Sequence, residues 1–175
     1  MAGKTSSPQV GLVLGSDSDW HVVRETAKVL DDFAVEYEVN VISAHRSPQA
    51  AHDYACSAGE RGLKVIIAAA GMAAHLAGAM AANTTLPVIG VPVASGTLGG
   101  MDALLATVQM PPGVPVATVA IGPTGARNAA VLAVQILALA DAGLAKKLAE
   151  YKADMETKVA ERSKKLADRI ASKEE

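Results

Sequence analysis

A chain of 175 residues, half of them apolar, is long enough to form one domain with a sizeable core. Its formal net charge of −2 gives no electrostatic attraction to nucleic acid or to an anionic membrane, and one Trp and one Phe cannot form a base-stacking platform. The single Cys56 excludes an intrachain disulfide and a multi-cysteine metal site, and it suits a reducing compartment. The segment Met1–Gln9 lacks the apolar stretch of a signal peptide and is expected to be flexible, and no apolar run is long enough to span a membrane. We therefore expect a cytoplasmic protein.

The first strand is predicted at Val10–Leu14, and the loop Gly15–Asp19 follows it directly. Apolar residues at helical spacing continue from Val22 to about Asp32. The loop side chains therefore gather where a helix begins. An Asp at this place suits sugar hydroxyls better than phosphate, because its carboxylate accepts hydrogen bonds and repels phosphate. As an alternative, Ser18 or Asp19 only caps the helix.

The second predicted strand, Tyr37–Ile42, leads into a histidine beside an arginine, His45 and Arg46. A helix then begins, with Ser47 as the expected N-cap and Pro48 at the first helical position. The carboxyl end of a strand before a helix start is where α/β sheets bind anionic ligands. Histidine can give and take a proton near neutral pH, and arginine forms a fork for phosphate or carboxylate. The pair is a candidate site, although a histidine next to a helix start can also be structural.

The rest of the α/β region repeats the order strand, loop, helix, without an internal sequence repeat. The remaining strands are predicted at Val65–Ala70, Leu86–Val93 and Val116–Ile121, and the remaining helices at Pro48–Arg61, at Met101–Gln109, and from the turn Gly122–Gly125 to about Ala140. This order predicts an α/β domain over residues 10–140, with a parallel sheet of about five strands and helices on both faces.

Two loops at strand ends have more than one interpretation. His75 lies among the small residues of Ala70–Gly78, where backbone can approach a ligand closely, but a core histidine bonded to a carbonyl is an alternative. The glycine-rich loop Ser95–Gly100 is either a lid or a surface connection. The four histidines lack a ligand spacing such as HExxH, so no metal site is expected.

Residues 141–175 differ from the preceding region. Apolar residues from Leu144 to Ile170 recur three, four or seven positions apart, with Lys and Glu between them, which predicts one amphipathic helix. Because it follows a complete sheet unit, we expect its apolar stripe to pack on a neighbouring subunit. The alternative is a solvated helix that frays after Val159.

Several motifs in this order resemble one enzyme family. They are Gly15–Trp20, Ser43–Arg46, Ala73–Leu76, Val108–Pro111 and Ala120–Gly122. Over Val10 to about Leu139 the chain resembles the 5-(carboxyamino)imidazole ribonucleotide mutases of purine biosynthesis. The resemblance implies a flavodoxin-like three-layer α/β/α fold, a homo-octamer, and the isomerisation of a small nucleotide without cofactor or metal.

The resemblance also implies roles for individual residues. By this resemblance, His45 is the acid and base that moves the proton. Asp19 contacts the ribose hydroxyls, and Arg46 binds the phosphate together with Ser18 and Ser43. Ser16 and Gly71 hold the migrating carboxylate, and His75 supports that carboxylate pocket. The related carboxylase, which uses free carbon dioxide, typically has Lys in place of Arg46. A non-catalytic nucleotide-binding module is the other alternative, but it gives no reason for His45 beside Arg46.

The chain departs from the usual family pattern at several positions. Ala69, Met72 and Ala77 replace Gly, Gly and Pro, and Ala103 and Ala106 stand where Ser is common. The changes next to the expected carboxylate pocket predict an altered pocket shape rather than a different reaction.

Overall fold

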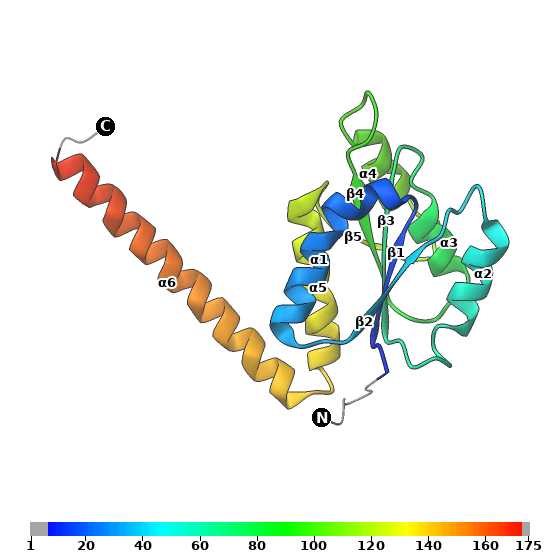
Figure 1. Ribbon diagram of the computed structural model, residues 1–175, viewed down its shortest axis with the longest axis horizontal. Helices are drawn as coiled ribbons and strands as arrows, with labels where there is room; N and C mark the ends of the chain where they lie inside the picture. The colour runs from blue at the N-terminus through cyan, green and yellow to red at the C-terminus, as the bar shows by residue number, and fades with distance from the viewer. Residues whose placement is uncertain (1–6, 173–175) are drawn as a thin grey trace. The chain divides into compact units, whose positions relative to one another are not determined.

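The computed structural model describes residues 7–172, so residues 1–6 of the N-terminal segment expected to be flexible lie outside the described part. The chain divides into two compact units, one ending at Ile136 and one beginning at Leu137. The first unit contains a five-stranded parallel sheet in the order β2-β1-β3-β4-β5 (Figure 1). The strands are β1 Val10–Leu14, β2 Tyr37–Val41, β3 Val65–Gly71, β4 Val88–Val93 and β5 Ala117–Thr118.

The sheet order creates a crevice at one edge. β2 lies on one side of β1 and β3 on the other, so the direction in which the strands are added reverses at β1. Parallel sheets bind ligands at such a switch point, outside the carboxyl ends of the strands. β1 and β4 are buried along their whole length, as expected for apolar strands covered on both faces. The predicted flavodoxin-like architecture is confirmed.

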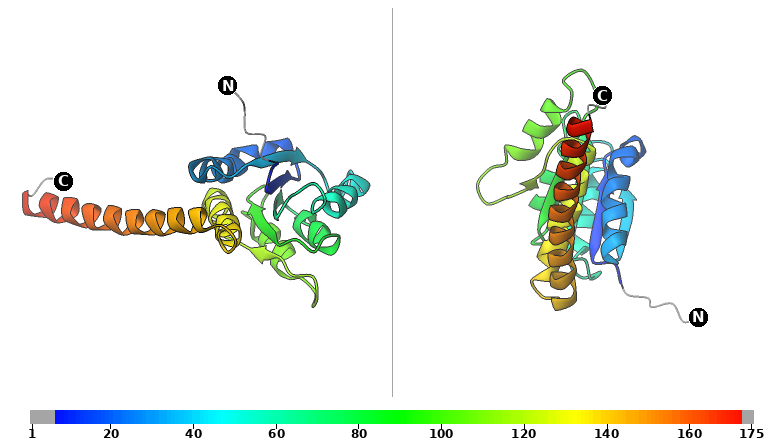
Figure 2. Two further views of the ribbon diagram at one scale, coloured as in Figure 1. Left: turned by 90° about the horizontal axis from the view of Figure 1, so that it is seen from below. Right: turned by 90° about the vertical axis from the view of Figure 1, so that its left-hand side faces the viewer.

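Helices cover both faces of this sheet. They are α1 Trp20–Phe33, α2 Pro48–Ser57, α3 Leu76–Ala82, α4 Met101–Val108 and α5 Pro123–Ala138. α1 and α5 cover one face, where the buried Thr26 hydroxyl donates to Ala126 O at 2.8 Å (Figure 1, Figure 2). α3 and α4 cover the other, because a Cβ on Gly90 of β4 would meet both Thr107 of α4 and Ala77 of α3. α2 packs beside α3 on that face.

The fifth strand is shorter than predicted. It has two residues, Ala117–Thr118, in place of the predicted Val116–Ile121. Beyond it the chain still follows β4, with Val119 N–H donating to Gly90 O and Gly122 N–H donating to Pro92 O. Pro92 faces the same edge but has no N–H, so the regular ladder cannot continue there.

Several other boundaries also differ from the prediction, most of them by a single residue. α2 ends at Ser57 rather than at Arg61, and a turn follows in which Gly62 has φ +98° and Leu63 N–H donates to Ala58 O. A left-handed glycine with this bond is a common way for a helix to end. β4 begins at Val88 rather than at Leu86.

The second unit consists mainly of one helix, α6 Ala142–Ser172. Asp141 caps it by accepting the N–H groups of Gly143 and Leu144 at 2.8 and 3.0 Å. The helix continues past Val159, the point after which fraying was the alternative. Among the described helices, none combines the length and apolarity that crossing a bilayer requires.

Candidate functional site

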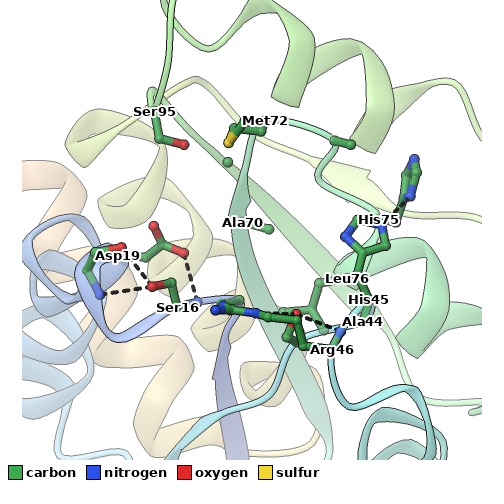
Figure 3. A pocket seen from close by; sticks show the side chains of 15 residues that line it. Ser16, Asp19, Ala44, His45, Arg46, Ala70, Met72, His75, Leu76 and Ser95 are labelled. Carbon is green, nitrogen blue, oxygen red and sulfur yellow. Dashed lines mark hydrogen bonds between the residues drawn. The ribbon is translucent and has the colours of Figure 1, made fainter.

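A hollow of about 540 Å³ lies at the carboxyl edge of the sheet (Figure 3). The loops after β1, β2, β3 and β4 all contribute to it. All eight candidate residues from the sequence line it: Ser16, Ser18, Asp19, Ser43, His45, Arg46, Gly71 and His75. Parallel strands end at the same edge, which is why residues far apart in the sequence meet here.

The loop after β1 is organised by a reciprocal cap. The Ser16 hydroxyl accepts Ser18 N–H, and the Asp19 carboxylate accepts Ser16 N–H at 3.2 Å. This reciprocal cap belongs to the short 3-10 turn Asp17–Asp19, with Ser16 at its N-cap position. Asp19 stands at the N-cap position of α1, as the alternative allowed, but its side chain makes no capping bond to that helix. Burial raises the pKa of the Asp19 carboxyl above its ordinary value, and the bond from Ser16 partly offsets this.

The loop after β2 holds the arginine. Ser43 Oγ accepts Arg46 N–H at 3.2 Å and Arg46 Nε–H at 3.4 Å, and Arg46 Nη2 donates to Gly15 O at 3.2 Å. These bonds use two of the five side-chain N–H groups of the guanidinium, so three remain for an anion. Ser47 stands at the N-cap position as predicted, but its hydroxyl bonds to the backbone of Ser43 rather than capping α2.

His45 and His75 form a direct pair at one side of the hollow (Figure 3). His45 Nε2 lies 2.8 Å from His75 Nδ1, and the rings meet edge to face with centroids 4.9 Å apart. Such a short contact between two ring nitrogens needs a proton on one of them, so the pair shares a hydrogen bond. Both side chains are exposed to the hollow rather than buried, which excludes the core-histidine alternative for His75.

The end of β3 and the turn after it line the hollow with mostly small, uncharged residues. They are Ala70, Gly71, Met72 and Ala73, and Ser95 from the loop after β4 lies near Met72 (Figure 3). A Cβ on Gly71 would overlap the Ser95 hydroxyl, so only glycine fits at this position without movement. Figure 3 shows Met72 and Ser95 at one end and Arg46 at the other.

Seven of the fifteen lining residues were not assigned a site role from the sequence, and two of them, Ser95 and Met72, bring side chains longer than a methyl group from the loops after β4 and β3. Ser95 follows β4 as Ser16 and Ser43 follow β1 and β2, and that shared position was the available signal. Met72 was noted only as a departure from the family pattern. The other two departures beside it, Ala69 and Ala77, are buried in the core, so Met72 alone of the three reaches the hollow.

Comparisons with known proteins show which family the chain belongs to. A sequence profile described as AIR carboxylase matches residues 9–158. The chain belongs to the AIR carboxylase family. It is 57% identical over 152 residues to the N5-carboxyaminoimidazole ribonucleotide mutase of Pyrococcus abyssi, covering 87% of this chain and 86% of that one. It is 55% identical over 159 residues to the mutase of Bacillus subtilis, covering 91% and 98%.

The fold of this family member also matches a solved structure. The crystal structure of Treponema denticola PurE superposes with a TM-score of 0.81 at 27% identity, covering 91% of this chain and 98% of that one. Within residues 7–172, no cluster of three or more His, Cys, Asp or Glu side chains is arranged to hold a metal ion.

Proposed function

We propose that this chain converts N5-carboxyaminoimidazole ribonucleotide into 4-carboxy-5-aminoimidazole ribonucleotide inside the hollow, with carbon dioxide trapped there and His45 as acid and base. The family membership and the curated relatives make the protein an isomerase of purine biosynthesis, a mutase that transfers a carboxylate. The observation that carries the mechanism is that one cavity holds an arginine, a histidine pair and an apolar end.

The reaction needs one proton to be given and one to be taken. Protonation of the carbamate nitrogen breaks its C–N bond and releases carbon dioxide, leaving an electron-rich ring carbon. That carbon attacks the carbon dioxide, a C–C bond forms, and the ring carbon loses its proton. A single histidine can perform both transfers and end in its starting state. The hydrogen bond between His45 and His75 orients the ring that does this.

Binding is divided along the hollow. Arg46, with Ser43 bonded to it and Ser18 lining the same hollow, is suited to the phosphate, because its free N–H groups form a charged fork. One Asp19 oxygen is engaged by Ser16, and the other is suited to accept a ribose hydroxyl. Ser16 and Gly71 would hold the migrating carboxylate, and holding both reactants in one cavity supplies proximity.

The direct test is an assay with two sets of substrates: first the N-carboxylated nucleotide alone, and second aminoimidazole ribonucleotide with bicarbonate. The mutase should convert the N-carboxylated nucleotide, while aminoimidazole ribonucleotide with bicarbonate should react only slowly. If the second set is the better substrate, the chain is instead a carboxylase that uses free carbon dioxide. A chain that binds nucleotide but converts neither set would be a binding module.

The role of His45 is tested by His45→Asn. This variant should fold and bind nucleotide but turn over roughly 10²–10⁴-fold more slowly, the usual contribution of a positioned acid or base. His52→Asn is the matched control, because His52 lies on α2 and does not line the hollow. Substantial activity in His45→Asn would reject the acid–base role.

We also propose that the protein is cytoplasmic and forms a closed homo-oligomer, an octamer by family resemblance. Four large apolar side chains of α6 are exposed in the single chain: Met155, Val159, Leu166 and Ile170. An isolated amphipathic helix gains little stability in water unless its apolar face is covered. Sedimentation of the full chain should show the oligomer, and removal of the residues after Gly143 should lower the assembly state. A full-length monomer at micromolar concentration would contradict this proposal.

A further inference from the structure

Met72 has an unusual backbone at the mouth of the hollow. Among residues 7–172, two residues other than glycine have a left-handed φ, Ala34 at 56° and Met72 at 54°. Ala34 ends α1, where this conformation is common. Met72 ends no helix: it follows β3, where glycine would adopt the same φ without strain. A strained residue that lines a ligand cavity suggests that its side chain has a function there.

The side chain of Met72 lies at one end of the hollow (Figure 3). It lines the cavity, and 61% of the residue is exposed, so no other part of the chain buries this side chain. It also lies against the loop after β4, since a Cβ on Gly96 would be 3.8 Å from Met72 Cγ. Figure 3 shows it beside Ser95, at the end opposite Arg46.

This end of the cavity suits a neutral, apolar molecule. The lining residues next to Met72 in the chain, Ala70, Gly71 and Ala73, bring no charge, and Figure 3 shows Met72 at the end away from the charged fork of Arg46. Carbon dioxide carries no net charge once the carbamate C–N bond has broken, so an ion pair can no longer hold it. It must be retained by shape until the new C–C bond forms. An open end would let it escape and leave aminoimidazole ribonucleotide behind.

We propose that the Met72 side chain is a cap that keeps carbon dioxide in the hollow between the two chemical steps. This rests on the proposed trapped-intermediate mechanism. A methionine suits the task because its unbranched, apolar side chain moves aside for the entering nucleotide and then fills irregular space. A glycine at position 72 would leave this end covered by the loop after β4 alone.

The experiment follows the fate of the carboxylate carbon. Substrate with ¹³C in the carbamate is converted in unlabelled bicarbonate buffer, and mass spectrometry measures the ¹³C retained in the product, with enzyme-free decarboxylation subtracted. Met72→Gly should lose roughly four- to fifteenfold more label than wild type, the factor expected for one or two methylene-sized contacts. Met72→Leu, which keeps an apolar side chain, should retain label nearly as wild type does.

Ala34→Gly is the matched control. It relieves the same left-handed backbone at a position outside the hollow. Both glycine variants should have a Tm equal to or slightly above that of wild type, and Ala34→Gly should retain label fully. A loss of label in Met72→Gly at an undiminished Tm therefore reports the missing side chain and not a damaged fold.

Three results would overturn the proposal, and they differ from one another. If Met72→Gly retains label as well as wild type, the cap is wrong while the mechanism stands. If the wild-type product draws its carbon mainly from bicarbonate, carbon dioxide is not trapped and the cap fails with it. If wild type makes no product from the labelled substrate, the proposed function itself is wrong.

Discussion

Replacing Arg46 by alanine should weaken binding of the nucleotide through its phosphate alone. In the structure, Ser43 and Gly15 engage two side-chain N–H groups of Arg46. The three remaining N–H groups are enough for a two-bond contact with a phosphate. Hydrogen bonds to charged groups contribute about 1.5–3 kcal/mol each when well shielded. Because Arg46 is exposed, solvent screens the contact, and we expect about 1.5–3 kcal/mol for the whole fork.

That free energy corresponds to a dissociation constant for Arg46→Ala roughly 10- to 150-fold weaker than for wild type. Calorimetry with the stable 4-carboxy nucleotide product measures it directly. The same titration with the dephosphorylated nucleoside separates the phosphate from the rest of the ligand. The nucleoside should bind equally to wild type and Arg46→Ala, and Arg46→Lys should lose less than the alanine variant because it keeps the charge but not the fork.

The outcome that would refute this reasoning is an equal loss of affinity for nucleotide and nucleoside. Arg46 also bonds Gly15 O and so connects two loops of the hollow. An equal loss would mean that this structural contact, and not the phosphate, accounts for the effect of the substitution.

Two further predictions concern stability. Gly71→Ala should lower the free energy of unfolding by about 1–3 kcal/mol, because the added Cβ would overlap the Ser95 hydroxyl and lie 3.1 Å from Val93 O. In urea titrations, the additional substitution Ser95→Gly should recover part of this loss. The control Gly59→Ala should change little, because nothing lies within 4 Å of its added Cβ. Thr26→Val should lower the free energy of unfolding by about 1 kcal/mol, because it removes the buried hydrogen bond to Ala126 O, whereas Thr26→Ser keeps that bond. Equal urea midpoints for Thr26→Val and wild type would show that the bond contributes nothing to stability.

The sequence by itself determined most of the elements and the edge at which the site lies, although the helix α3 was not predicted from it. Apolar runs such as Val10–Leu14 and Val65–Ala70 predict buried strands because a parallel sheet is covered on both faces. The loops after them were candidates because the carboxyl ends of parallel strands meet at one edge. His45 and Arg46 were identified because their chemistry is visible in the residue types alone.

The tertiary structure decided which groups meet and how they are held. His45 and His75 are 30 positions apart, and no local pattern specifies the 2.8 Å contact between their rings. The ladder of β5 stops because of Pro92 on a different strand, which only the strand order reveals. The left-handed backbone of Met72 depends on the neighbours that hold it against its own preference, so its position over the hollow follows from packing and not from propensity.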